Sequence, residues 1–187
     1  MQQKVKNKNL YVITGGPGVG KTTLLKELEK HGYKTIPEEA RRIIKEQIEI
    51  NGNGLPWKNK ELYGELMFKA TLKTYFETLE KHPEQTIFFD RGILDTHCYF
   101  EMENIPITKE MKQITDQITY NNKVYILPPW QEIYETDTER KQTWEEALYT
   151  YNKMKEPYQK HGYTVIEVPK LNTQDRAEFI IKQLNLK

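Results

Sequence analysis

Short, mostly apolar runs alternate with longer amphipathic segments along this chain, a pattern that predicts strands alternating with helices. Apolar runs of four to six residues that end at glycine, proline or aspartate are typical of buried strands. Five such runs predict five strands, at residues 10–14, 33–36, 86–89, 123–127 and 163–168. Apolar residues at helical spacing predict the helices between and after them. These lie at residues 21–31, 38–50, 61–81, 93–103, 108–120, 142–161 and 173–186, with Thr173 as the expected N-cap of the last.

This alternation predicts an α/β fold whose strands pair in parallel through right-handed helical crossovers. A parallel sheet of this kind binds ligands beyond the carboxyl ends of its strands. The residues that follow each strand are therefore the candidates for a functional site.

The composition fits one globular domain, expected to span residues 1–187. Lys and Arg number 28 and Asp and Glu number 27, so the near-neutral balance predicts no nucleic-acid partner. No apolar run approaches the roughly 20 residues of a membrane span. Cys98 is the single cysteine, expected as a half-buried free thiol. Together these features favour a cytoplasmic protein.

A phosphate-binding loop follows the first predicted strand, because Gly15–Thr22 matches the pattern G-x-x-x-x-G-K-[ST] in full. The glycines let backbone N–H groups converge on one anion, at the positive end of the following helix. Lys21 supplies a charge for the β- and γ-phosphates, and Thr22 supplies a hydroxyl for Mg²⁺. The alternative, a glycine-rich turn beside a surface lysine, does not explain the strand before it and the helix after it. The predicted ATP-binding residues are Gly15, Gly16, Pro17, Gly18, Val19, Gly20, Lys21, Thr22 and Thr23.

Charged residues also follow the second and third strands. Glu38 is a candidate to accept a proton or to hold a metal-bound water, and Arg41 to bind an anionic acceptor. Both equally fit the solvated first turn of a helix. Asp90 ends the third strand, where a carboxylate that holds the water of Mg²⁺ is expected, although a simple turn aspartate stays possible. Arg91 is either a substrate clamp or a surface charge. Asp95, one helical turn beyond Arg91, can face the same cleft or solvent, and solvent is favoured.

The polar segment 134–141 follows the fourth strand and is a candidate lid over the phosphates, within residues 130–142. Its Arg140 can bring positive charge to a migrating phosphoryl group, although most charge runs are solvated surfaces. Residues 168–172 can pack on a purine ring or merely connect a strand to a helix. Trp57, Tyr63 and Phe68 are candidates for an acceptor pocket, but ordinary packing is favoured for them. His97 is expected to be structural.

The order of these motifs resembles a family of small AAA-like P-loop proteins related to the nicotinamide riboside kinase domain. The resemblance rests on ITGGPGVGKTTLLKEL, PEEARRII, FFDRGILD, ILPPWQEIYETDTERKQTWEEA and GYTVIEVPK. It implies a three-layer P-loop NTPase fold, with strand order 2-3-1-4-5, helices on both faces and a lid. It also implies ATP with Mg²⁺, Lys21 and Thr22 on the phosphates, and Asp90 near the metal. Glu38, Arg41 and Arg140 match the family's acidic, basic and lid positions.

These features favour an ATP-dependent phosphotransferase that acts on a small acceptor through Lys21, Asp90, Glu38 and Arg140. The resemblance keeps two alternatives open, an ATPase and a nucleotide-dependent switch that binds a partner, because family members are described as ATPases and one relative as a regulator. No N-K-x-D pattern for guanine is present, which leans toward adenine. No recognisable nucleotide-acceptor signature is present either, so the acceptor is not predicted.

Overall fold

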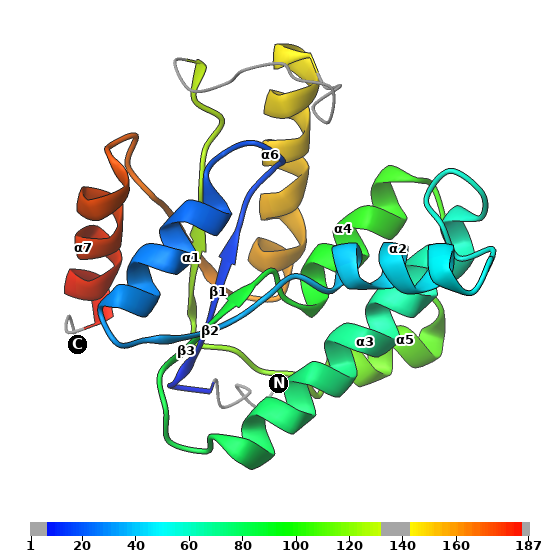
Figure 1. Cartoon of the computed structure of the whole chain (residues 1–187), viewed down its shortest axis with the longest axis horizontal. Helices are drawn as coiled ribbons and strands as arrows, with labels where there is room; N and C mark the ends of the chain where they lie inside the picture. Colours follow the sequence, from blue (N-terminus) through cyan, green and yellow to red (C-terminus); the bar gives the residue numbers. More distant parts are fainter. Residues whose placement is uncertain (1–6, 132–142, 185–187) are drawn as a thin grey trace.

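The computed structural model describes residues 7–131 and 143–184, which form a parallel sheet between two layers of helices (Figure 1). The strands are β1 (Leu10–Thr14), β2 (Lys34–Ile36), β3 (Ile87–Asp90), β4 (Lys123–Ile126) and β5 (Thr164–Glu167). Their order in the sheet is β2-β3-β1-β4-β5, and every neighbouring pair is parallel. The predicted fold class and strand order are therefore confirmed, with β1 at the centre.

The helices follow the predicted segments closely, with one clear difference. They are α1 (Lys21–Lys30), α2 (Glu39–Glu49), α3 (Lys60–Lys81), α4 (Ile93–Met102), α5 (Lys109–Thr115), α6 (Trp144–Lys160) and α7 (Thr173–Leu184). The predicted helix 108–120 ends early because Tyr120 is fully buried in the core and the Asn121 N–H donates to the Leu10 carbonyl at 2.6 Å. The cap of α7 also differs, since the Asn172 side chain, one residue before Thr173, accepts from the Asp175 N–H at 3.0 Å.

The sheet separates two cores, because successive residues of a strand point to opposite faces. Leu10 and Val12 of β1 join the core under α3, α4, α5 and α6. Tyr11 and Ile13 join the core under α1 and α7, which lie together on the other face in Figure 1. This double coverage explains why the strands read as nearly continuous apolar runs.

Helix α2 packs mainly on α3 rather than on the sheet (Figure 1). Ile43 of α2 forms a small separate core with Tyr63 and Met67 of α3. Helix α2 and the part of α3 around Tyr63 and Met67 therefore lie beside the residues that follow β2 and β3, whereas the rest of α3 covers the sheet. Within the described residues, no helix has the length and apolar character that a membrane span needs.

Candidate functional site

The phosphate loop between β1 and α1 has a backbone that requires glycine. Gly15, Gly18 and Gly20 have φ angles of 143°, 77° and 88°, which side-chain-bearing residues rarely adopt. A Cβ on Gly15 would also lie only 2.8 Å from the Leu127 carbonyl oxygen. The loop is therefore a close-packed turn that presents backbone to an incoming ligand, as a phosphate cradle must.

Lys21, the first residue of α1, folds its side chain back over this turn. Its ammonium group donates to the Gly15 carbonyl at 3.0 Å and to the Gly16 carbonyl at 3.3 Å. Burial, together with the nearby Arg91 charge, lowers the pKa of Lys21 to about 8, although Asp90 and Glu38 act in the opposite direction. A poorly hydrated cation at the end of a helix is suited to bind phosphate. Thr22 and Thr23 lie in the same helical turn and are open to solvent.

Asp90 ends β3 and is paired in register with Ile13 of the neighbouring β1, so its carboxylate lies next to the start of the phosphate loop. Its Oδ1 atom is buried and has no hydrogen-bond partner within residues 7–131 and 143–184. Burial raises the pKa of Asp90, Lys21 lowers it, and Glu38 raises it again. An unsatisfied buried carboxylate oxygen suggests a missing ligand such as a metal-bound water.

Arg91 is neither a surface charge nor a free clamp, because carboxylates already hold it. Its Nε donates to Glu38 at 3.0 Å, and its Nη1 lies 3.6 Å from Asp95. Its φ of 71° lies in the left-handed region, which for a residue with a side chain costs about 1 kcal/mol or more. Burial tends to lower the pKa of Arg91, but Glu38, Asp95 and Asp90 outweigh this and raise it.

Glu38 comes directly before α2 and faces Arg91 across the space between the ends of β2 and β3. Burial works to raise the pKa of Glu38. The positive charges of Arg91 and Lys21 outweigh burial and hold that pKa below its ordinary value. Glu38 is therefore an ionised hydrogen-bond acceptor at neutral pH.

Asp95 does not face solvent as expected, since only 8% of it is exposed. Its carboxylate accepts hydrogen bonds from the Thr14 hydroxyl, from the Gly92 N–H at 2.8 Å and from the Tyr158 hydroxyl at 2.5 Å. Asp95 thus ties the end of β1 to α4 and α6 while it also faces Arg91. Its spacing of one helical turn after Arg91 was the signal for this placement, but spacing alone does not show which face of α4 is buried.

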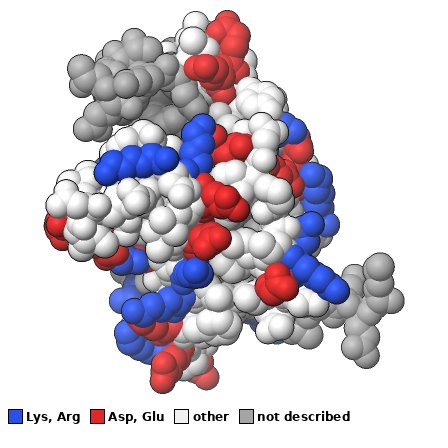
Figure 2. All heavy atoms as spheres, turned by 90° about the vertical axis from the view of Figure 1, so that its right-hand side faces the viewer, with Lys and Arg blue, Asp and Glu red and all other residues white. Residues whose placement is uncertain are grey.

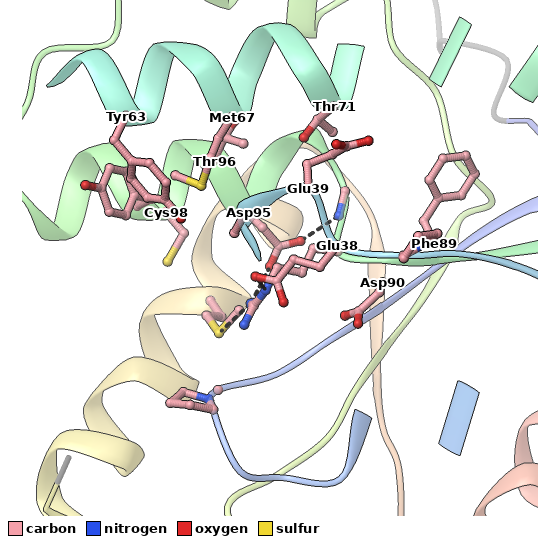
Figure 3. A pocket seen from close by; sticks show the side chains of 18 of the residues that line it. Glu38, Glu39, Tyr63, Met67, Thr71, Phe89, Asp90, Asp95, Thr96 and Cys98 are labelled. Atoms are coloured by element: carbon pink, nitrogen blue, oxygen red, sulfur yellow. Dashed lines mark hydrogen bonds and ion pairs between the residues drawn. The ribbon is translucent and has the colours of Figure 1, made fainter. Parts of the chain in front are cut away.

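A cavity of about 840 Å³ opens beside Gly16 and Pro17 of the phosphate loop, enclosed by α2, α3, α4 and α6 (Figure 3). Its two ends differ in chemistry. The charged end holds Glu38, Asp90, Arg91 and Asp95. The other end is mainly apolar, with Tyr63, Met67, Cys98, Tyr99 and Met102 among its walls.

The structure places the remaining predicted residues in different settings. Arg41 is exposed on the first turn of α2 and does not line the cavity, and Arg140, with most of the predicted lid 130–142, lies outside the described residues. Tyr63 lines the cavity, whereas Trp57 is exposed and Phe68 packs in the main core.

Two sequence predictions about α4 can also be compared with the structure. His97 is structural as predicted, since it is buried with its Nε2 2.8 Å from the Thr115 hydroxyl. Cys98 is fully buried rather than half-buried. Burial, with Asp95 nearby, raises the pKa of its thiol to about 12, so it is a neutral apolar wall of the cavity.

The loop after β5 borders a second, smaller hollow of about 270 Å³ next to the phosphate loop. Leu171 and Asn172 lie on one side of it, and Gly20 and Thr23 lie on the other. The loop thus lies beside the first turn of α1, and packing of this loop on a purine ring stays a prediction, with a plain strand–helix connection as its alternative.

Comparisons with known proteins agree with this architecture. A family model described as an AAA domain matches residues 10–176. A search of the curated proteins found no match. Among solved structures, the chain is similar to deoxyadenosine kinase from M. mycoides with bound dATP, with a TM-score of 0.60 and 19% identity over 95% of this chain and 100% of that one.

Two further solved structures share the fold. NadR protein in complex with NR gives a TM-score of 0.72 at 15% identity, over 96% of this chain and 52% of that chain. Thymidylate kinase from Ehrlichia chaffeensis gives 0.60 at 14% identity, over 95% and 98% of the two chains. At these identities the similarity establishes a common fold.

Proposed function

This chain belongs to the AAA domain family of P-loop proteins, and from that premise we propose that it is an ATP-dependent phosphotransferase acting on a small acceptor that bears a hydroxyl group. One observation carries the proposal. The phosphate loop opens directly onto a cavity of about 840 Å³, with Glu38, Asp90 and Arg91 on the walls where the two meet. An ATPase or a switch needs the loop alone, whereas a phosphotransferase also needs a ligand-sized cavity beside it for the acceptor.

The residues of the loop fit a triphosphate with Mg²⁺. The glycines with positive φ present backbone to the phosphates, and the Lys21 ammonium is placed to exchange its two carbonyl contacts for phosphate oxygens. Thr22 and the unsatisfied Oδ1 of Asp90 would hold Mg²⁺ directly or through water. Within the described residues, no group of three or more His, Cys, Asp or Glu side chains can hold a metal alone. A metal that arrives with the nucleotide fits this arrangement, and MgATP supplies the phosphoryl group that is transferred.

Glu38 and Arg91 then define the acceptor side of the reaction. Glu38 is ionised at neutral pH and is open to the cavity, so it can accept the hydrogen bond of an acceptor hydroxyl and orient its oxygen toward the γ-phosphate. The Arg91 Nε donates to the Glu38 carboxylate at 3.0 Å and so holds it in place, and the guanidinium puts positive charge beside the phosphoryl group as it is transferred. Asp95 acts on the reaction through Arg91 and is a positioning residue.

The structural relatives support this proposal. Two of them are named as kinases of a nucleoside and of a nucleotide, and one of these holds dATP. The third is described in complex with NR. Each therefore combines this fold with a nucleotide or a small ligand. No described feature of the chain favours a switch over a phosphotransferase.

The test is ADP formation from MgATP in the presence of a panel of hydroxyl-bearing metabolites. We expect at least one to raise the rate well above the basal rate, and Asp90→Asn to lower kcat about 100-fold with nearly unchanged MgATP affinity. Asp116→Asn, an exposed aspartate after α5, is the matched control and should behave as the native protein does. If MgATP binds but no metabolite stimulates turnover, the chain is an ATPase or a switch and the proposal is wrong.

A further inference from the structure

We infer that the acceptor is an uncharged or cationic ring compound that bears a hydroxyl group, such as a nucleoside, and not an anion such as a nucleoside monophosphate. This inference rests on the proposed phosphotransferase function and assigns the chemical class of its acceptor. Two independent features of the cavity carry it. One is the balance of charge on its walls, and the other is the chemistry of the end away from the phosphate loop.

The first feature is that carboxylates outnumber cations around the cavity. Five acidic side chains line it, namely Glu38, Glu39, Asp90, Asp95 and Glu103. Arg91 is the one basic residue that lines it in the part of the chain that the structure describes. Figure 2 shows acidic side chains near the middle of the face that α2 and α4 help to form, with basic side chains beside them rather than in one large patch.

Arg91 already pairs with two of these carboxylates. Its guanidinium lies between Glu38, at 3.0 Å, and Asp95, at 3.6 Å. An anionic acceptor would have to displace a carboxylate from Arg91 or share the guanidinium with it. Either way, negative charge would be added next to negative charge in a partly desolvated space.

Two basic residues that pair with acids of the cavity wall are committed in the same way, whereas Arg41, whose charge helps to lower the pKa of Glu38, is exposed and does not line the cavity. Arg42 donates to Glu39 at 2.6 Å and also bonds Glu46, while Lys60 donates to Glu103 at 2.5 Å. Lys21 faces the phosphate loop, where the proposed function has it bind the triphosphate rather than the acceptor. A phosphate or carboxylate on the acceptor would therefore meet fixed acids whose cations are already paired, which disfavours anions relative to neutral or cationic molecules.

The second feature is an aromatic and thioether wall at the other end. Tyr63 and Tyr99 make an edge-to-face pair with centroids 5.6 Å apart, and Met67 and Cys98 lie beside Tyr63 in Figure 3. Burial, with the charge of Glu38, raises the pKa of Tyr63 to about 12, so its phenol is neutral. Aromatic and sulfur-containing walls bind flat rings well, and aromatic faces also attract cations.

The volume of the cavity joins the two features. At about 840 Å³ it falls in the range of roughly 300–1,000 Å³ that holds a drug-sized ligand, and it exceeds what a lone sugar or small hydroxy acid would fill. A molecule with a ring at the Tyr63 end and a hydroxylated part at the Glu38 end would span it. A nucleoside has this construction, and its hydroxyl would reach Glu38 without bringing a charge.

The experiment compares matched ligand pairs in the full chain with MgADP bound, so that a monophosphate cannot occupy the phosphate loop. The pairs are adenosine and AMP, cytidine and CMP, and thymidine and TMP, with 1-methyladenosine as a cationic probe, titrated by calorimetry. We expect at least one uncharged or cationic member to bind, and about 30-fold or more tightly than its monophosphate, because like charges placed together are strongly unfavourable. Equal or tighter binding of the monophosphates overturns the inference. So does the failure of every uncharged and cationic member to bind at millimolar concentration.

A variant tests the cause of the discrimination. Glu38→Gln removes one carboxylate and leaves Asp95 as the one acid paired with Arg91 among the described residues, so the preference for nucleoside over monophosphate should fall about tenfold. Glu46→Gln is the matched control, since Glu46 is an exposed acid of α2 that also pairs with an arginine, and it should leave the preference unchanged. An unchanged preference in Glu38→Gln overturns the electrostatic argument.

MgATP titrated into the same protein separates the two proposals. If MgATP does not bind, the proposed function fails. If MgATP binds and a monophosphate or a carboxylate is phosphorylated best, the phosphotransferase stands and only the acceptor class is wrong.

Discussion

The phosphate loop and the acceptor cavity meet at one edge of the sheet, but the chain builds them in opposite ways. The loop is local, because residues 15–22 lie consecutively between β1 and α1. The cavity is assembled from parts distant in sequence, since its walls run from Gly16 to Met154 and come from the ends of β2 and β3 and from four helices.

Different forces also fix the two regions. The loop depends on backbone geometry that glycine alone adopts readily, with φ angles up to 143° at Gly15. The cavity depends on side-chain packing, because the contact of Ile43 with Tyr63 and Met67 holds α2 against α3. The comparison predicts that a substitution in the loop impairs MgATP binding without impairing acceptor binding, and that a substitution in the cavity wall does the reverse. The two sites are coupled through the charged residues at their junction, namely Glu38, Asp90, Arg91 and Asp95.

The largest effect should come from a change in the loop alone. Lys21→Ala removes the buried ammonium that faces the cradle, so we expect kcat/KM for MgATP to fall about 1,000-fold or more. Binding of an uncharged acceptor to the cavity should change little. Calorimetry with MgATP and with the acceptor measures both halves on one sample.

Lys26→Ala is the control for that variant, because Lys26 is an exposed lysine of the same helix and should behave as the native residue does. Unchanged MgATP affinity in Lys21→Ala would remove the loop from the site. An equal loss of acceptor binding would contradict the independence of the two regions.

A second, smaller effect should appear with pH, and it should change MgATP binding at the loop without changing acceptor binding in the cavity. The pKa of Lys21 lies at about 8, so its charge is present below pH 8 and is lost as the pH rises through that value. We expect MgATP affinity to be nearly constant from pH 7 to pH 7.5 and to fall up to about tenfold per pH unit above pH 8. Acceptor binding should change little over the same range, since the pKa of Glu38 is below its ordinary value and that of Tyr63 is about 12.

Lys21→Arg sharpens the pH experiment, because arginine keeps its charge throughout this range. Its absolute affinity for MgATP can be lower, so the readout is the slope. A flat profile is expected for this variant, and a flat profile in the native protein would show that Lys21 keeps its charge at high pH.

The same contrast explains what the sequence predicted and what it did not. The strands, the phosphate loop and the place of Asp90 at the end of β3 follow from contiguous signals, namely apolar runs, turn residues and one spaced motif, and the strand order follows from the family resemblance. The end of α5 was predicted five residues too late, because a helical pattern continues through Ile118 although the chain has already turned to bury Tyr120. The spacing of apolar residues along the chain carries no information about such long-range packing.

The cavity was predictable only in part. Glu38 and Arg91 were candidates because they follow strands, but their mutual ion pair joins residues 53 positions apart and has no local signal. Solvent was favoured for Asp95, and this was wrong, because its partners Thr14 and Tyr158 come from β1 and α6 and leave no local signal in the sequence. At the apolar end, Tyr63 was a candidate for an acceptor pocket, although ordinary packing was favoured for it. Met67 and Tyr99 beside it were not candidates, because they read equally well as ordinary core residues of α3 and α4.

The smallest effect should come from that apolar end. Met67→Ala removes thioether and methylene contacts from the wall against which we place the ring of the acceptor, so the KM for the acceptor should rise about fivefold, while kcat and the KM for MgATP change little. Met111→Ala is the matched control, since Met111 packs at the edge of the main core and does not line the cavity. Both variants lose some apolar packing, so thermal unfolding should fall in both, and only Met67→Ala should alter the acceptor KM. An acceptor KM that stays at the native value in Met67→Ala would mean that the ring lies elsewhere, because Met67 lines the apolar end of the cavity and belongs neither to the phosphate loop nor to the four charged residues at the junction.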